Sequence, residues 1–365
     1  MKKIITLLLA LSILPEINAQ FHTLKVPQAS NQITVSQRLA VTDITIKYHS
    51  PSARGRDVWN DTNIIPQNGN PIPWRAGANM NTTIEFTTDV FVEGKELKAG
   101  VYGFHIIPKG ETYTLLFAHG NNQWGSYYLD VEKDITLSVD VSIESAQNSE
   151  KLDYEFLNWK EDSVTIGLEW GDKRIPFKVS VDLNKTVIDS FRSELRGINT
   201  YHWQAWNDAA NWCLNHNTNL EEALQWANRS IKGGYGGFAA NKNFENVFTK
   251  IKLLKELNRM DEYKKTVKEM SLVEYSAYQS HRLVRALLYE KQYNEALSFS
   301  TEATTKHAKV WYLILNRSLS NYFTKNTKKA LKDMKVAIEM APKQFKKGLE
   351  KASEDMKKGT YALPS

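Results

Sequence analysis

Residues 50–79 read SPSARGRDVWNDTNIIPQNGNPIPWRAGAN, and this stretch divides the strand-like segments that decide the fold. Its prolines and glycines predict a long loop, because proline has no backbone N–H to donate and glycine favours turns. Loops carry binding and catalytic groups more often than regular elements do. A site is therefore expected first among the polar and aromatic residues gathered here, which are Arg54, Arg56, Asp57, Trp59, Trp74, Arg75 and Asn79.

Short segments on both sides of this loop have the composition of β-strands. Residues 33–48, ITVSQRLAVTDITIKY, are rich in β-branched side chains and partly alternate between apolar and polar. In residues 82–94, Ile84 and Phe86 would face one way and Glu85 the other. Similar segments follow at 102–106, 112–118, 134–143, 151–159, 163–171 and 174–182. Short strands joined by turns predict an antiparallel β-sandwich or barrel-like domain over residues 20–183, with no helical period inside it.

The pattern becomes helical after residue 183. Asn184-Lys185-Thr186 can cap a linker helix within residues 184–200, and Gly197 ends it. Helices then continue through residues 201–358, with breaks at 215–219, 232–237 and 341–342, and residues 359–365 form a tail. The chain is thus expected to be a multidomain β plus α protein.

An internal repeat identifies the type of helical domain. LEEALQWANRS, YNEALSFSTEA and TKKALKDMKVA align on Ala223, Ala296 and Ala330, and the last two alanines are 34 residues apart, the tetratricopeptide period. A further, degenerate unit is centred on Thr266. Small residues at these positions let two antiparallel helices approach closely. The sequence therefore predicts an irregular, all-α tetratricopeptide-like solenoid.

The N-terminus has the pattern of a signal peptide over residues 1–19. Lys2 and Lys3 precede an apolar run of eleven residues, 4–14, and Ala19 is a suitable residue for cleavage. The run is too short to cross a bilayer as a helix, and no later segment is apolar enough to do so. The mature chain is expected to begin at Gln20 and to be periplasmic or secreted.

Charge is distributed unequally between the two parts. Residues 20–183 carry 15 basic and 21 acidic side chains, whereas residues 184–365 carry 30 and 19. This asymmetry favours docking between the parts or a basic surface for an anionic partner. Nucleic acid is a poor partner for an exported protein. The single cysteine, Cys213, excludes an intrachain disulfide and lies in an apolar helical pattern, so a buried structural role is expected.

Two interpretations of the loop side chains remain open. Arginines 54, 56 and 75 could clamp a carboxylate, phosphate or sulfate, or they could pair with Asp57, Asp61 or Glu85 and fix the loop. Trp59, Trp74 and Trp124 could form a stacking platform for a sugar, or they could plug the open end of the sandwich. The turn NNQWG at 121–125 could place Gln123 and Trp124 beside the loop. The candidate ligand-binding residues are Arg54, Arg56, Asp57, Trp74, Arg75, Asn79, Glu85, His105, Gln123 and Trp124.

Metal and cofactor chemistry have little support in the sequence. His49, His105 and His119 with Glu85 could form a metal or acid/base site, but the histidines lack the close spacing of such sites. His105 falls opposite Phe104 and Ile106 in the strand alternation, so it is expected to face solvent or the loop. Phosphate-loop, nucleophile-elbow and H-E-x-x-H motifs are absent. No metal and no cofactor are predicted.

Four motifs in order carry a resemblance to a known family. SPSARGRDVW, PWRAGANMNTTIEF, VEGKELKAGVYGFHIIP and NNQWGSYY resemble the exported bacterial family called domain of unknown function 2911, over about residues 32–182. The helical part is similar to the tetratricopeptide-like tail often attached to such domains. The family commonly has V-P-Y-G-x-x-W-R where this chain has the longer IIPQNGNPIPWR. The resemblance implies export and a β fold, and it implies no reaction.

Three functions are compatible with these features. The first is an exported, non-enzymatic binding or scaffold protein, whose β domain binds a small anionic or glycan-like ligand and whose repeats bind a protein partner. The second is a hydrolase that uses Glu85, His105 and Asp57, which requires these side chains to converge. The third is a purely structural assembly protein in which the loop is an internal staple.

Overall fold

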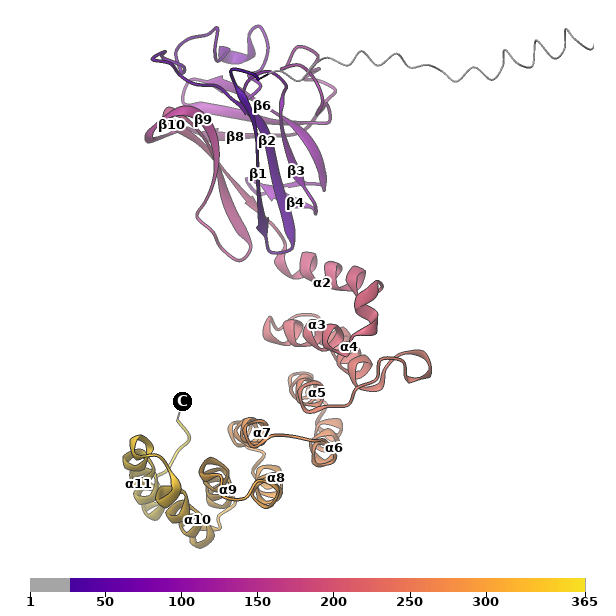
Figure 1. The fold of residues 1–365 in the computed structure, drawn as a ribbon, viewed down its shortest axis with the longest axis vertical. Coiled ribbons are helices and arrows are strands. Elements are labelled where there is room, and N and C mark those ends of the chain that lie inside the picture. Colours follow the sequence, from indigo (N-terminus) through magenta and orange to yellow (C-terminus); the bar gives the residue numbers. More distant parts are fainter. Residues whose placement is uncertain (1–26, 365) are drawn as a thin grey trace, which may run out of the picture. The chain divides into compact units, whose positions relative to one another are not determined.

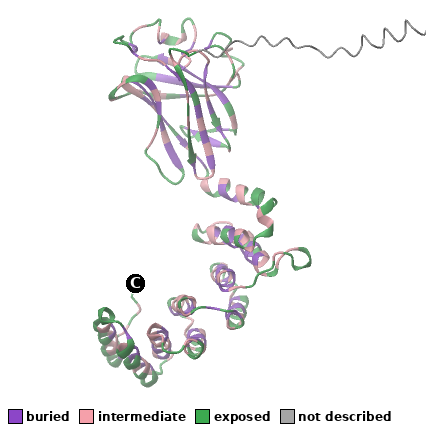
Figure 2. Cartoon of the chain, in the orientation of Figure 1, coloured by how far each residue is buried: buried purple, intermediate pink, exposed green. Residues whose placement is uncertain are grey.

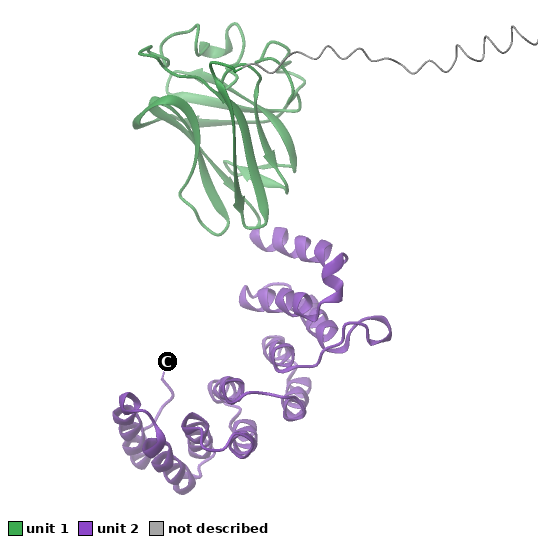
Figure 3. Cartoon of the chain, viewed as in Figure 1, with its two compact units in different colours: residues 1–182 green, residues 183–365 purple. Residues whose placement is uncertain are grey.

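The computed structural model describes residues 27–364, which form two compact units that meet in sequence between Asp182 and Leu183 (Figure 3). The predicted signal peptide and its cleavage site lie outside the described residues.

The first unit is a sandwich of two antiparallel sheets, as the alternating segments predicted (Figure 1). The six-stranded sheet has the order β1-β2-β3-β6-β7-β8, and the four-stranded sheet has the order β5-β4-β10-β9. Apolar side chains alternate along β2 and β3, whereas β6, β7 and β10 contain runs of consecutive buried residues, and the buried rows of the two sheets form one core (Figure 2). Phe104 of one sheet lies 5.5 Å from Phe177 of the other, measured between ring centroids. The strands are β1 Asn31–Leu39, β2 Thr42–Ser50, β3 Thr82–Phe86, β4 Val90–Val92, β5 Lys95–Leu97, β6 Gly100–Lys109, β7 Thr112–Ala118, β8 Ile135–Ser142, β9 Glu144–Leu157 and β10 Ser163–Ser180.

Two segments differ from their sequence-based description. Residues 33–48 do not run as one extended segment but form the hairpin β1–β2, in which Leu39 pairs with Thr42 and Ala40 has a positive φ of 53°. Residues 163–171 and 174–182 are not separate strands but parts of β10, which pairs with β9 through register shifts near Gly171. Such bulges keep a strand continuous while it bends, so Gly171 resembled a strand end.

The second unit is entirely helical in its regular structure. Helices α3 to α10 form four successive antiparallel pairs, with one row of helices on the inner side of the curve and the other row outside (Figure 1). The helices are α2 Leu183–Glu194, α3 Trp203–Asn215, α4 Leu220–Lys232, α5 Phe244–Glu256, α6 Met260–Glu269, α7 Ala277–Tyr289, α8 Tyr293–Lys306, α9 Trp311–Phe323, α10 Thr327–Met340 and α11 Lys343–Lys358. The predicted helical-repeat fold is confirmed.

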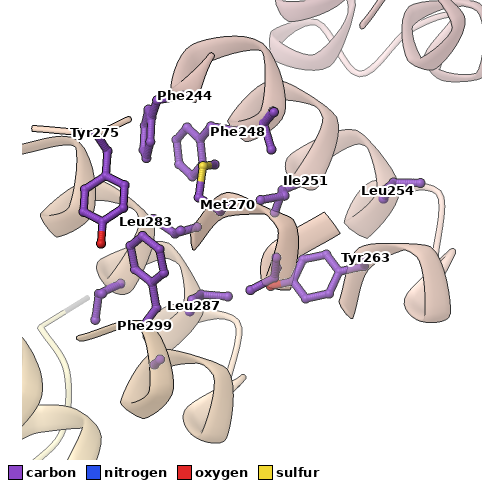
Figure 4. Packing of buried hydrophobic residues seen from close by; sticks show 14 of the residues in the cluster. Phe244, Phe248, Ile251, Leu254, Tyr263, Met270, Tyr275, Leu283, Leu287 and Phe299 are labelled. Atoms are coloured by element: carbon purple, nitrogen blue, oxygen red, sulfur yellow. The ribbon is translucent and has the colours of Figure 1, made fainter. Parts of the chain in front are cut away.

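The aligned positions of the repeat are the points where the paired helices touch. Ala223, Ala296 and Ala330 are each 0% exposed and lie in α4, α8 and α10, and Thr266 takes the same place in α6. Larger side chains of α5 to α8 fill the space between these close contacts (Figure 4). The sequence-based breaks were too few, because the short turns near residues 258, 274, 291, 308 and 325 contain neither glycine nor proline.

Two further predictions concern the burial of Cys213 and the presence of membrane-spanning helices. Cys213 is fully buried in α3, which agrees with a structural role, and burial raises the pKa of its thiol to about 11. Within residues 27–364, no helix is both long enough and apolar enough to cross a membrane.

Candidate functional site

The long loop is anchored to both sheets by two tryptophans. The backbone of Trp74 exchanges two hydrogen bonds of 2.8 Å with Ile106, so Trp74 extends the six-stranded sheet beside β6. Its ring stacks on Trp170 of the other sheet at 6.3 Å, and Trp59 donates a 2.8 Å hydrogen bond to the Trp170 carbonyl. Trp59 and Trp74 are 6% and 3% exposed, whereas Trp124 is 51% exposed. The interpretation in which tryptophans fill the end of the sandwich is therefore confirmed for Trp59 and Trp74. The interpretation in which Trp59, Trp74 and Trp124 form one stacking platform is wrong.

The first part of the loop satisfies its own polar groups. Arg56 donates to the carbonyls of Ala53 at 2.8 Å and Ser52 at 2.7 Å, so its guanidinium closes the loop on itself. Arg54 is exposed, and its backbone N–H donates to Glu150. Asp57 accepts a 2.7 Å hydrogen bond from the Asn60 amide, and this bond lowers the pKa of the Asp57 carboxyl. The second of the two interpretations, in which the loop arginines pair with Asp57, Asp61 or Glu85, is not seen among the described residues.

Arg75 lies at the other end of the loop, against the turn that follows β7. Its Nη1 donates a 2.7 Å hydrogen bond to the Asn79 carbonyl, which also accepts from the Gly125 N–H at 3.1 Å. The Arg75 Cζ lies 5.5 Å from the centre of the Tyr127 ring, a cation–π distance. Asn79 has a φ of 57°, and its side-chain amide donates to Gln28 at 3.1 Å. The hydrogen bond to Asn79 and the contact with the Tyr127 ring together fix the position of the Arg75 guanidinium.

The NNQWG turn does lie beside the loop. The Asn81 N–H donates to the Gln123 carbonyl, and the Gln123 N–H donates to the Asn81 side chain, both at 3.0 Å. Met80 and Trp124 form an isolated antiparallel bridge. The Gln123 side chain donates to the Gly120 carbonyl within its own turn, at 3.4 Å. These bonds hold the turn against the end of the loop through backbone contacts.

His105 is buried under this turn. It is 0% exposed, and its Nδ1 lies 2.7 Å from the Oγ of Ser126, which is itself 1% exposed. Its Nε2 is buried without a hydrogen-bond partner among the described residues. Burial, with a smaller effect from the charge of Arg75, lowers the pKa of His105 to about 4. His105 therefore faces the loop side, as one of the two expectations had it, and it is neutral at pH 7.

The groups of the proposed hydrolase site are not assembled. Glu85 is exposed on β3 opposite Val101, four residues along the strand from Asn81, which is roughly 13 Å of extended chain. Among residues 27–364, the hydrogen bonds of the Asp57 side chain stay within its own loop segment, and His105 faces Ser126. Elsewhere, His119 contacts Thr136 at 3.0 Å. In the described part of the chain, no group of three histidine, cysteine or acidic side chains could hold a metal ion.

A cavity of about 250 Å³ opens beside Arg75. Of the ten residues singled out from the sequence, Trp74 and Arg75 line it. The remaining wall consists of loop prolines, isoleucines and two small polar side chains together with the Tyr127 ring. The full lining is Thr62, Asn63, Ile64, Pro66, Pro71, Ile72, Pro73, Trp74, Arg75 and Tyr127. A larger cavity of about 650 Å³ lies at the sandwich edge near β8 and β10, but its wall carries Glu93, Asp140 and Glu144 against Lys178. The smaller cavity combines a cation with an aromatic ring.

Tyr127 and Ser126 were not singled out from the sequence. Both follow the NNQWG turn directly, in SYY, and Tyr127 is 63% exposed. The sequence feature that could have indicated these two residues is the pair of tyrosines directly after a polar turn. The contact of Tyr127 with Arg75, 52 residues earlier in the chain, could be found only from the fold.

Three solved structures are similar to parts of the chain. The protein titled "MamA RS-1 ArsTM double mutant" has 16% identity and a TM-score of 0.31, and the match covers 43% of this chain and 88% of that one. YrrB, titled a TPR protein with an unusual peptide-binding site, has 15% identity and a TM-score of 0.33, over 46% of this chain and 82% of YrrB. MamA 41-end from Desulfovibrio magneticus RS-1 has 16% identity and a TM-score of 0.30, over 43% and 88%. No curated protein matches the chain.

The family resemblance concerns the sandwich. The matched residues, 30–179, run from one residue before β1 to one residue before the end of β10, so they contain the Arg75 cavity and the turn that covers His105. Residues 30–179 match the model of the family described as "Protein of unknown function (DUF2911)".

Proposed function

We propose that this chain is a non-enzymatic binding protein. Its β unit takes a small anionic ligand in the Arg75 cavity, and its helical unit binds a protein partner. The observation that carries the first half is the Arg75 guanidinium, which forms part of the cavity wall and has no carboxylate partner among the described residues.

The chemistry of the cavity favours an anion attached to a flat or apolar body. The Arg75 guanidinium donates one N–H to the Asn79 carbonyl, so its other N–H groups can bind a carboxylate, phosphate or sulfate. The exposed Tyr127 ring offers a face on which a sugar could stack. A volume of about 250 Å³ is below the range of drug-sized ligands, so a single sugar acid or a similar small acid fits the space.

Catalysis has less support at this cavity. Arg75 and Tyr127 are the titratable side chains among its lining residues, and neither is placed as a nucleophile next to a general base. The buried His105 and Ser126 are in contact, but both are inaccessible and neither lines the cavity. A hydrolase therefore has no set of catalytic groups here to support it.

The helical unit suits a protein partner. Stacked helix pairs present a long continuous surface, and here the inner row of helices carries exposed aromatic side chains, including Tyr278 at 65% and Tyr289 at 49% exposed. Basic side chains outnumber acidic ones in this part of the sequence by 30 to 19. These features favour a partner with acidic and aromatic groups.

Export belongs to the same proposal. The pattern of residues 1–19 supports cleavage near Ala19 and release into the periplasm or the medium. N-terminal sequencing of the protein purified from its own cells tests this point. A mature chain that retains Lys2 and Lys3 would contradict it.

The binding proposal is tested by calorimetric titration of the full chain with glucuronate, sulfate and inorganic phosphate. We expect at least one of them to bind, and Arg75→Gln to weaken that binding roughly tenfold or more, since a charge-assisted hydrogen bond contributes about 1.5–3 kcal/mol. Arg54→Gln is the matched control, because Arg54 is exposed and lies outside the cavity wall. Equal losses in the two variants, or binding that Arg75→Gln leaves intact, would contradict the Arg75 site.

A further inference from the structure

The end of the chain folds back onto the helical unit. Helix α11 ends at Lys358 and is followed by Gly359, which has a φ of 74°. Two hydrogen bonds close the helix end, from Gly359 N–H to the Met356 carbonyl and from Thr360 N–H to the Asp355 carbonyl. This pairing is the Schellman motif, which reverses the chain direction after a helix. The residues that follow are therefore directed away from the axis of α11.

The tail then crosses α9. The ring of Tyr361 lies 5.7 Å from that of Tyr322 and 6.1 Å from that of Phe323, measured between centroids. Leu363 packs against the same apolar cluster, and both tail side chains are partly buried, whereas Ala362 between them is exposed. Burial raises the pKa of the Tyr361 hydroxyl. Alternate side chains thus point into the helical unit, as they do in an extended peptide.

The tail ends against α7. The Tyr289 hydroxyl donates a 3.0 Å hydrogen bond to the Pro364 carbonyl, and Arg285 donates a 2.7 Å bond to the Tyr289 oxygen. The Arg285 guanidinium also lies 4.9 Å from the centre of the Tyr289 ring. A backbone carbonyl of the tail is therefore recognised by a side chain that a second side chain orients.

The aromatic surface continues beyond the tail. Along α7, Tyr278 stacks on His281 at 6.4 Å, and His281 meets Tyr312 of α9 at 5.4 Å. Tyr278, His281, Arg285 and Tyr289 recur at helical spacing and share one face of α7. This face is longer than the part that the tail contacts.

We propose that Arg285, Tyr289, Tyr322 and Phe323 form a docking surface for an extended peptide segment, which the chain's own residues 360–364 occupy until a partner segment displaces them. The tail defines the chemistry of that partner segment, which carries an aromatic side chain and, two residues later, an aliphatic one, followed by a backbone carbonyl for Tyr289. This inference rests on the proposed role of the helical unit in binding a protein, and it specifies the site and its regulation.

A tethered tail competes strongly with a free segment. A short tether holds its ligand at an effective concentration of about millimolar, so an outside peptide must exceed that value before it binds. Substitutions that weaken the contacts of the tail should expose the docking surface without changing the residues that form it. The side chains to change are Tyr361 and Leu363, because they belong to the tail alone.

The experiment measures the fluorescence anisotropy of a labelled peptide, GTYALPS, which copies residues 359–365. We expect it to bind the full chain carrying Tyr361→Ala and Leu363→Ser about tenfold or more tightly than the wild-type chain. Ala362→Ser is the control in the tail, since Ala362 is exposed, and it should behave as wild type. Adding Tyr322→Ala to the loosened variant should abolish binding, whereas adding Tyr235→Ala, at a fully exposed residue elsewhere, should not.

In the anisotropy experiment, two results would overturn the proposal. They are failure of the peptide to bind the loosened variant, and equal affinity for the loosened and wild-type chains. If the loosened variant does not fold, carboxypeptidase digestion of the full chain takes its place, and Tyr289→Phe should release tail residues faster than wild type. Equal release rates would overturn the proposal as well. A protein partner that binds wild type and Tyr322→Ala equally would overturn this docking surface while leaving the protein-binding role of the helical unit intact.

Discussion

The guanidinium of Arg75 lies directly over the α-carbon of Gly125. A Cβ placed on Gly125 would come within 2.5 Å of the Arg75 Cζ, and Gly125 has a φ of 63°. The Arg75 guanidinium in its observed position therefore leaves no room for a Cβ at Gly125, fifty residues away.

Gly125→Ala should destabilise the β unit and displace Arg75. A left-handed alanine costs about 1–2 kcal/mol, and the clash with Arg75 adds to it, so a total of roughly 2–4 kcal/mol is expected. Gly110→Ala is the matched control, because Gly110 has a φ of 71° and a Cβ added there would meet no atom within 4 Å. Urea unfolding measures both. Equal losses in the two variants would mean that the Arg75 contact adds nothing.

Trp59→Phe should cost about 2–4 kcal/mol of unfolding free energy. The change removes the 2.8 Å hydrogen bond to the Trp170 carbonyl and leaves a small cavity in the buried plug. Trp124→Phe, at a half-exposed ring, should change stability by about 0.5 kcal/mol or less. Thermal unfolding followed by circular dichroism compares them. A larger loss for Trp124→Phe would contradict the assignment of Trp59 to the core.

His105 should make the stability of the β unit depend on pH. Its pKa is about 4 in the fold against an ordinary value of 6.5, so between these values the unfolded chain binds a proton that the folded chain does not. The unfolding free energy should therefore fall as pH falls from about 6.5 to 4, with a contribution of roughly 3 kcal/mol from this residue.

His105→Gln should flatten that dependence, because glutamine stays neutral and can still bond to Ser126. Urea unfolding at pH 7 and pH 4.5 measures the difference. His119→Gln is the control, since His119 is exposed. If His105→Gln leaves the slope between the two pH values unchanged, His105 does not carry the effect.

Ala296→Leu should destabilise the helical unit by about 1–3 kcal/mol, since a larger side chain would force apart helices that meet at a residue with no exposed surface. Ser298→Leu, in the same helix but exposed, should change stability by about 0.5 kcal/mol or less. Chemical unfolding monitored by the helical circular dichroism signal distinguishes them. Similar effects at both positions would contradict the close helix contact.

The parts of the fold that the sequence predicted correctly have strong local signals. Alternation in β3 reflects one buried face, and the recurring alanines of α4, α8 and α10 reflect a helix contact repeated along the chain. The hairpin at Ala40 and the bulge near Gly171 were missed, because a non-glycine residue with positive φ and a bulged strand have no distinctive local pattern. The short helix turns were missed for the same reason.

The same distinction between local and long-range features applies to the candidate site. The sequence by itself determined that arginine and tryptophan gather in one long loop and that a polar turn follows β7, because residue type and turn chemistry are local properties. Only the tertiary structure decided that Arg56 binds its own loop, that Trp59 and Trp74 are core residues, and that Arg75 meets Gly125 and Tyr127 at a cavity. These outcomes depend on which distant backbone each side chain meets when the two sheets close, and that is set by packing across the whole unit.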